Sequence, residues 1–109
     1  MSNLIVGDVS RELIRTLRPL VAKIRRRDRA LADQLIRAAS SISLNIFEAD
    51  YSDPGNKRSR LFTASGSANE TRGALFLATD WNYLTVDEAK PAEALLDRVI
   101  AMLWKLTHQ

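Results

Sequence analysis

The sequence predicts an all-α protein, an antiparallel up-down four-helix bundle. Apolar residues recur at steps of three and four through most of the 109 residues, which is the spacing of one helix face. No segment shows the apolar/polar alternation of a strand. The helical segments are separated by short connections, which favour antiparallel neighbours. The length fits one domain spanning residues 1–109.

The first helix is expected to start near Asp8 or Ser10, either of which can act as an N-cap. Pro19 removes a backbone donor, so a kink or local break is expected there. The apolar stripe of this helix consists of Val9, Leu13, Leu17, Leu20, Val21 and Ile24.

The second helix is expected over about residues 30–49 and has two apolar faces, one of them formed by Leu44 and Phe47. A helix that is apolar on more than one side contacts more than one neighbour, either inside the fold or across a subunit contact.

Turn-forming residues occupy 50–56 and separate this helix from a long third helix over residues 57–84. Thr85 and Glu88 have the spacing of a capping box, which predicts the start of a fourth helix. Pro91 lies inside that helix, so a short first turn or a kink is expected.

The composition excludes several classes of chemistry. The chain has no cysteine, which excludes disulfides, thiol catalysis, zinc fingers and iron–sulfur clusters, and its one histidine, His108, excludes a multi-histidine metal site. We expect no cofactor and no metal. The sequence shows neither a signal peptide nor a membrane-spanning segment, so a cytoplasmic protein without membrane contact is expected.

Two stretches of the sequence carry a recognisable pattern. Residues 34–48 read Q-x-x-R-A-A-x-S-I-x-x-N-I-x-E, and G-S-x-x-E follows at residues 66–70. The pattern residues are Gln34, Arg37, Ser41, Asn45, Glu48, Gly66, Ser67 and Glu70. The sequence resembles the four-helix-bundle family of proteins encoded in intervening sequences of bacterial large-subunit ribosomal RNA. That family is related in fold to the accessory variability determinant of diversity-generating retroelements. Ala49 departs from the pattern, because the family has glycine there.

The resemblance implies a small homo-oligomer, often a pentameric ring. For the retroelement relatives it implies binding of RNA and of a reverse transcriptase. It implies no established catalytic activity.

An antiparallel pairing of the second and third helices predicts which pattern residues face each other. Arg37 is expected to form an ion pair with Glu70, and Glu48 is expected to lie near Arg58 or Arg60. Gly66 is expected to allow a close approach to Ser41. Asn45 is expected to satisfy backbone groups rather than to contact a ligand.

One dense basic run spans residues 23–29, and it admits two interpretations. It is either a solvated helix end or a site that binds phosphates. No aromatic residue lies within the run, so contact with the nucleic-acid backbone is expected rather than stacking on unpaired bases. The candidate nucleic-acid-binding residues are Lys23, Arg25, Arg26, Arg27 and Arg29, with Lys57, Arg58 and Arg60 as a second cluster at the opposite end of the bundle.

Three aromatic residues lie near the ends of the third and fourth helices: Trp81, Tyr83 and Trp104. Packing at the core or its rim is the default for them, and a subunit contact is the alternative. Glu48 and Glu70 lack the Glu-x-x-His pairs of a di-iron site, and the serines lack a histidine base within the folded body.

The sequence therefore predicts a non-enzymatic homo-oligomer, expected as a pentamer, that binds RNA or other nucleic acid through a basic surface. The alternative is a protein–protein adaptor for a partner enzyme such as a reverse transcriptase, with nucleic-acid contact incidental.

Overall fold

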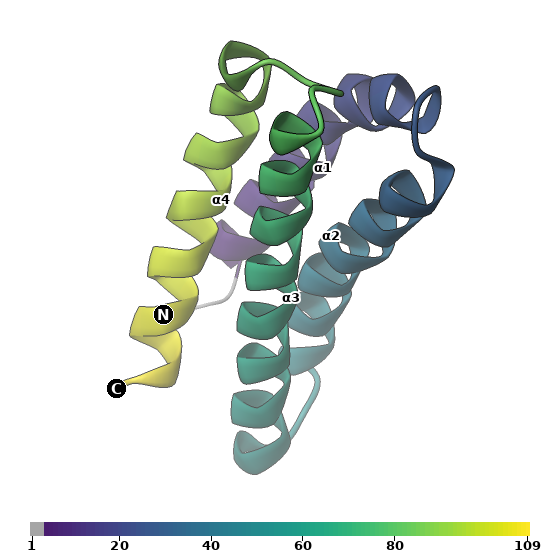
Figure 1. The fold of residues 1–109 in the computed structure, drawn as a ribbon. Coiled ribbons are helices and arrows are strands. Elements are labelled where there is room, and N and C mark those ends of the chain that lie inside the picture. Colours follow the sequence, from purple (N-terminus) through teal and green to yellow (C-terminus); the bar gives the residue numbers. More distant parts are fainter. Residues whose placement is uncertain (1–3) are drawn as a thin grey trace.

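The computed structural model describes residues 4–109, and these form four α-helices. They are α1 (Leu4–Arg25), α2 (Arg29–Ala49), α3 (Pro54–Asp80) and α4 (Val86–Thr107). Each helix packs against the next and α4 also packs against α1, so the helices form a closed bundle (Figure 1). No strand occurs in this part of the chain. The predicted all-α four-helix bundle is confirmed.

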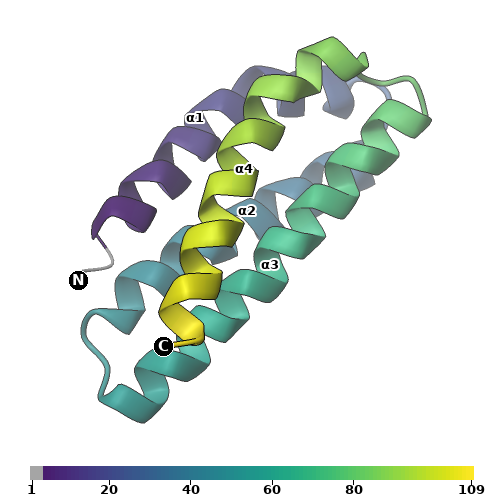
Figure 2. The ribbon, with the colours of Figure 1, turned by 90° about the vertical axis from the view of Figure 1, so that its left-hand side faces the viewer.

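The bundle is elongated and measures 42 × 22 × 19 Å. In this up-down arrangement successive connections lie at opposite ends of the bundle. Figures 1 and 2 show the α1–α2 and α3–α4 connections at one end, and the α2–α3 connection at the other end together with the C-terminus. Residues 23–29 and residues 81–85, which are distant in the sequence, are therefore brought to the same end.

All four helices contribute to one cluster of buried apolar side chains. Its largest fully buried members include Leu13, Leu35, Ile42, Leu75 and Leu96. These residues belong to stripes at helical spacing, so burial of their side chains stabilises both the helices and the packing between them.

α1 begins earlier than predicted, because it is already helical at Leu4. Neither Asp8 nor Ser10 is a cap. Ser10 is buried: its hydroxyl donates to the Gly7 carbonyl at 2.7 Å and shares a 2.8 Å hydrogen bond with the Ser43 hydroxyl. The polar residue that suggested a helix start thus forms a contact between α1 and α2.

The two internal prolines do not interrupt their helices, so the local break predicted as one outcome at Pro19 does not occur; the alternative of a kink at Pro19 or Pro91 stays a prediction. α1 continues through Pro19 and α4 continues through Pro91. Both prolines are exposed, and so are Arg15 and Asp87, whose carbonyls lose their helical partner. Water can hydrogen-bond these carbonyls, which lowers the cost of an internal proline.

Side chains define the starts of the other helices. The Asp28 carboxylate caps α2 by accepting the Leu31 amide at 3.0 Å. Asp53 caps α3, and Pro54 is the first helical residue, so this helix starts three residues before the predicted 57. The predicted capping box of Thr85 and Glu88 is present in both directions.

α3 ends at Asp80, four residues before the predicted end. Asn82 has a φ of 62°, the Asn82 amide donates to the Thr79 carbonyl, and the Tyr83 amide donates to the Ala78 carbonyl. This is the Schellman arrangement, with asparagine at the left-handed position that glycine usually occupies. The turn directs Tyr83 back toward the bundle.

Candidate nucleic-acid interface

The basic run lies at one end of the bundle and is divided among three elements. Lys23 and Arg25 are in the last turn of α1, Arg26 and Arg27 are in the connection, and Arg29 is the first residue of α2. We call these five residues the basic end. Lys23, Arg26 and Arg27 line one groove at this end, whereas Arg25 lines the neighbouring groove between α1 and α2.

Two of the five charges are paired with acids. The Lys23 amine donates to Glu88 of α4 at 2.6 Å, and the Arg25 guanidinium donates to Asp33 of α2 at 2.8 Å. The hydrogen bond from Lys23 and the bonds from Thr85 lower the pKa of the Glu88 carboxyl below its usual 4.5. The Lys23–Glu88 pair therefore ties α1 to α4 while it neutralises part of the basic end.

Arg26 and Arg29 are exposed, and neither has an acidic partner within 4.0 Å among residues 4–109. Arg27 is also exposed, and its guanidinium lies 5.6 Å from the centre of the Tyr83 ring, within the range of a cation–π contact. Three arginines of the basic end thus keep their charge available to a ligand.

Tyr83 adds an aromatic ring to the basic end, although no aromatic residue lies within residues 23–29 themselves. Its hydroxyl donates to Asp28 at 3.1 Å. Partial burial and this hydrogen bond raise the pKa of the Tyr83 hydroxyl above 10.0. A groove of about 400 Å³, which we call the Tyr83 groove, is lined by Lys23, Arg26, Arg27, Asn82, Tyr83, Leu84 and Thr85. An up-down bundle places its first and third connections at the same end. This topology was the signal that could have indicated the aromatic side chain of Tyr83 beside the basic end.

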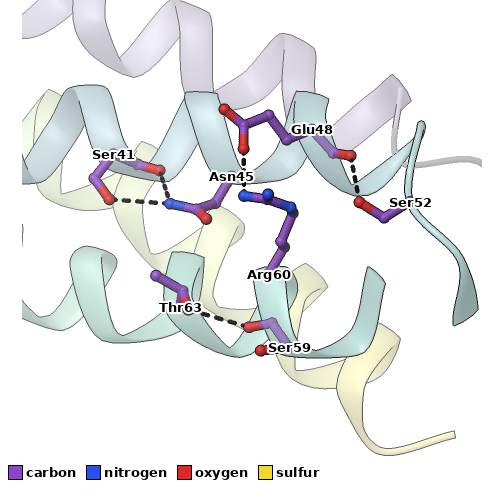
Figure 3. Close-up of polar contacts among 7 residues, drawn as sticks. All are labelled: Ser41, Asn45, Glu48, Ser52, Ser59, Arg60 and Thr63. Atoms are coloured by element: carbon purple, nitrogen blue, oxygen red, sulfur yellow. Dashed lines mark hydrogen bonds and ion pairs between the residues drawn. The ribbon is translucent and has the colours of Figure 1, made fainter. Parts of the chain in front are cut away.

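The second basic cluster lies in the first two turns of α3, at the opposite end of the bundle. Glu48 of α2 was expected near Arg58 or Arg60, and it forms an ion pair with Arg60 (Figure 3). The Arg58 guanidinium lies 5.2 Å from the centre of the Phe62 ring, and Lys57 is half-buried. The Asn56 amide lowers the pKa of the nearby Asp53 carboxyl. Only Arg60 of this cluster is paired with an acid, so the cluster keeps two cations without an acidic partner within 4.0 Å in residues 4–109, against three at the basic end.

The pattern residues other than Gly66 lie along the α2–α3 contact. A groove of about 260 Å³ is lined by Gln34, Arg37, Ala38, Ser41, Ser67 and Glu70. The Ser67 hydroxyl donates to the Ser41 hydroxyl at 2.8 Å, and the Asn45 amide donates to the Ser41 carbonyl at 2.9 Å. Figure 3 shows Asn45 beside Ser41 on α2. The predicted antiparallel register and the predicted backbone bond of Asn45 are confirmed.

Two predicted contacts in this region are wrong. Gly66 is exposed, and a β-carbon built on it would meet no atom within 4 Å, so it permits no close approach to Ser41. Ser67, one residue further and about 100° around the helix, makes that contact instead. Arg37 and Glu70 line the same groove but form no ion pair, because their charged atoms lie more than 4.0 Å apart.

Gly7 is the glycine that sits in a close contact. A β-carbon there would lie 3.1 Å from the ring of Phe47, so α1 and α2 approach each other closely at this point. Phe47 is thus used inside the fold, whereas Leu44, its predicted neighbour on the second apolar face, is 60% exposed. The predicted second face of α2 thus divides between a contact with α1 at Phe47 and an exposed side chain at Leu44, and a subunit contact at Leu44 stays a prediction.

The α1–α2 edge also carries an apolar groove of about 400 Å³. It is lined by Ile14, Leu17, Arg18, Val21, Ala22, Arg25, Leu35, Ile36, Ala39 and Ser40. Ile36 is 40% exposed, and it lies two turns before Leu44 on α2. A surface of this kind on a small protein is typical of an interaction site.

Residues 4–109 contain no group of three or more histidine, aspartate or glutamate side chains placed to hold a metal ion. His108 stacks on Trp104, with ring centres 4.3 Å apart. In the same part of the chain, no helix combines the length and apolarity needed to cross a membrane.

Comparison with known proteins identifies the family of this chain. The family model described as "23S rRNA-intervening sequence protein" matches residues 2–105. The chain belongs to this family. Membership agrees with the resemblance carried by the pattern residues along the α2–α3 contact.

A solved structure has the same fold as this member of the 23S rRNA-intervening sequence protein family. It is a protein of unknown function from the S23 ribosomal protein family of Bacteroides thetaiotaomicron VPI-5482. The two share 23% sequence identity, with a TM-score of 0.86 over 95% of this chain and 99% of the other. A search of curated proteins finds no match.

Proposed function

We propose that this member of the 23S rRNA-intervening sequence protein family is a non-enzymatic, self-associating protein that binds RNA or other nucleic acid through the basic end. The observation that carries the proposal is the state of Arg26, Arg27 and Arg29. All three are exposed, and none has an acidic partner within 4.0 Å in residues 4–109.

Arginine suits this role because its planar guanidinium can donate two parallel hydrogen bonds to a phosphate. Contacts of this kind depend on the charged backbone of the nucleic acid, so the affinity falls as salt rises.

Self-association is supported by the apolar groove between α1 and α2. Burial of the exposed Ile36 and Leu44 side chains against a second copy would remove apolar surface from water. A second groove of about 410 Å³ lies on the opposite, α3–α4 side and includes Ile100 and Trp104. Contact between these unlike faces is heterologous and can close into a ring, which fits the expected pentamer.

A ring would also strengthen nucleic-acid binding. Each copy contributes one basic end, and symmetry would repeat the arginines around the axis. Several weak phosphate contacts on one assembly raise the overall affinity without any new type of contact.

A filter-binding titration with single-stranded RNA tests the proposed interface. We expect Arg26→Glu, Arg27→Glu and Arg29→Glu together to lower the RNA affinity at least a hundredfold at low salt, because each reversal replaces attraction by repulsion. The matched control is Lys57→Glu with Arg58→Glu at the opposite end, which should change the affinity much less. Unchanged affinity in the triple variant would exclude the basic end.

Light scattering tests the self-association. Ile36→Glu with Leu44→Glu should reduce the mass of the particle toward that of one copy, because two charges would enter the buried surface. Val86→Glu is the matched control, since Val86 is exposed but lies outside both apolar grooves. A wild-type protein that is monomeric at high concentration would contradict the proposal.

The second candidate function is a protein–protein adaptor. The same apolar α1–α2 groove favours it, because this surface could bind a partner enzyme such as a reverse transcriptase instead of a second copy. A complex with such an enzyme that is insensitive to salt and lost in the Ile36→Glu, Leu44→Glu variant would favour the adaptor.

A further inference from the structure

The Tyr83 groove combines groups that recognise the two parts of a nucleotide. Cationic side chains come from the end of α1 and the following connection, and an aromatic ring and an amide come from the α3–α4 connection. Its volume of about 400 Å³ is within the range of small-ligand sites, roughly 300–1,000 Å³.

Several polar groups in this groove already have partners within the fold. The Lys23 amine bonds to Glu88, the Tyr83 hydroxyl bonds to Asp28, and the Thr85 hydroxyl accepts the Glu88 amide. The Arg26 guanidinium and the Asn82 side chain make no side-chain hydrogen bond to any of residues 4–109. These two groups are available to a ligand.

The Arg27–Tyr83 contact provides a surface for stacking. The Arg27 guanidinium lies over the Tyr83 ring, and the hydrogen bond to Asp28 holds that ring in place. Bases stack on aromatic rings and on guanidinium planes, and the stacking energy depends little on which base is bound. The stacking surface and the unpaired Arg26 guanidinium line one groove, so a single nucleotide can reach both.

We infer that the Tyr83 groove binds one unpaired nucleotide of single-stranded RNA, with its phosphate on Arg26 and its base against the Arg27–Tyr83 pair. This inference rests on the proposed RNA-binding function and specifies the form of RNA that the basic end prefers. Bases inside a duplex are stacked on each other and cannot enter the groove, so a duplex could use only the phosphate contacts.

Fluorescence of Trp81 provides a local measurement. The chain has two tryptophans, and Trp104 lies near the far end of α4, so Trp104→Phe leaves Trp81 as the only reporter. Trp81 is 64% exposed and directly precedes Asn82 of the groove. The probes are a single-stranded oligouridylate of roughly ten nucleotides, the same strand paired with oligoadenylate, and uridine monophosphate.

We expect the single strand to change Trp81 fluorescence and to bind roughly tenfold more tightly than the duplex at equal salt, because stacking adds to the phosphate contacts. Equal affinity for single strand and duplex would overturn the inference, and so would unchanged Trp81 fluorescence at saturation. Uridine monophosphate that binds as tightly as the oligonucleotide would overturn the assignment to RNA.

Variants separate the ring from the charge. Tyr83→Leu should bring the affinities for single strand and duplex close to parity, whereas Tyr83→Phe should keep most of the preference because it keeps the ring. Arg27→Lys keeps the charge and loses the stacking plane, so it should also reduce the preference. Loss of preference in Tyr83→Phe equal to that in Tyr83→Leu would contradict the role of the ring.

The two proposals fail in different ways. If the triple glutamate variant of the basic end binds RNA normally, the proposed function is wrong. If that variant loses RNA affinity but the wild-type protein does not distinguish single strand from duplex, the proposed function stands and the stacking site is excluded. Thermal melting of each variant shows that the compared proteins are folded.

Discussion

The Tyr83 hydroxyl donates a 3.1 Å hydrogen bond to the carboxylate of Asp28, which lies 55 residues earlier in the chain. The other oxygen of the same carboxylate caps α2 by accepting the Leu31 amide. One side chain therefore starts a helix and joins the two connections at this end of the bundle. The position of the basic end relative to the aromatic ring depends on it.

Asp28→Ala is expected to lower the free energy of unfolding by about 1 kcal/mol through loss of the cap, with a further loss from the bond to Tyr83. Asp53→Ala is the matched control, since Asp53 caps α3 but bonds only to Asn56 within its own first turn. Urea denaturation measures the free energy of unfolding of the two variants. Equal losses would show that the bond between the two connections adds nothing to stability.

The raised pKa of Tyr83 predicts a loss of stability in alkaline solution. Its hydroxyl ionises at a higher pH in the folded than in the unfolded protein, so its contribution is fully present below pH 10.0 and is lost as the pH rises through the folded-state value. In a Tyr51→Phe background, phenolate absorbance reports Tyr83 alone, because the chain has two tyrosines. Tyr83→Phe should remove this part of the pH dependence, and a titration midpoint at or below 10.0 would contradict the account.

The lowered pKa of Glu88 predicts the opposite dependence. The carboxylate contributes stability above pH 4.5, and this contribution is lost as the pH falls through the folded-state value. Glu88→Gln should flatten the acid limb of the stability curve while it keeps the capping box, since glutamine can serve at that position.

The same Glu88→Gln change should increase the RNA affinity a few-fold at low salt, because it releases the charge of Lys23 at the basic end. Glu48→Gln also removes one paired negative charge, but that carboxylate pairs with Arg60 at the opposite end of the bundle and lies outside both apolar grooves, so it serves as the control. An equal gain in both variants would indicate a nonspecific effect of net charge.

The two glycines Gly66 and Gly7 should respond differently to alanine. Gly66→Ala should raise the free energy of unfolding by about 0.5–1 kcal/mol, because the position is helical and the new methyl group meets no atom within 4 Å. Gly7→Ala should be less favourable, since its methyl group would press on the Phe47 ring. Combining Gly7→Ala with Phe47→Leu should remove the stability difference between Gly7→Ala and Gly66→Ala, because the smaller side chain leaves room for the methyl group. Identical effects of Gly7→Ala and Gly66→Ala on the free energy of unfolding would contradict the close contact.

The helices and their register could be predicted from local signals in the sequence. The capping box at Thr85 and the apolar stripes each depend on a few neighbouring residues. The Ser41–Ser67 and Glu48–Arg60 pairs follow from antiparallel packing of two helices. Pro54 belongs to the turn-forming residues 50–56, but proline is also favourable as a first helical residue, so α3 starts there and not at 57.

The features that escaped prediction depend on rotation about a helix axis or on contacts between distant segments. A helix turns about 100° per residue, so assigning the close contact to Gly66 instead of Ser67 moved it to the wrong face. The sequence predicts only packing or a subunit contact for Tyr83. Its position beside Arg27 depends on the bundle topology and on the turn at Asn82, which local sequence signals do not reveal. The ion pairs of Lys23 and Arg25, which reduce the charge of the basic end, also depend on contacts between different helices, with Glu88 of α4 and Asp33 of α2.

The salt dependence of RNA binding tests the role of the basic end most directly. The measurement is the slope of the logarithm of the binding constant against the logarithm of salt concentration, for the wild-type protein and for Arg26→Gln with Arg29→Gln. We predict that the slope for single-stranded RNA becomes shallower by about 0.7 for each arginine removed. Lys57→Gln with Arg58→Gln should leave it unchanged. An unchanged slope in the Arg26, Arg29 variant would contradict the account, since those arginines would then not contact phosphates.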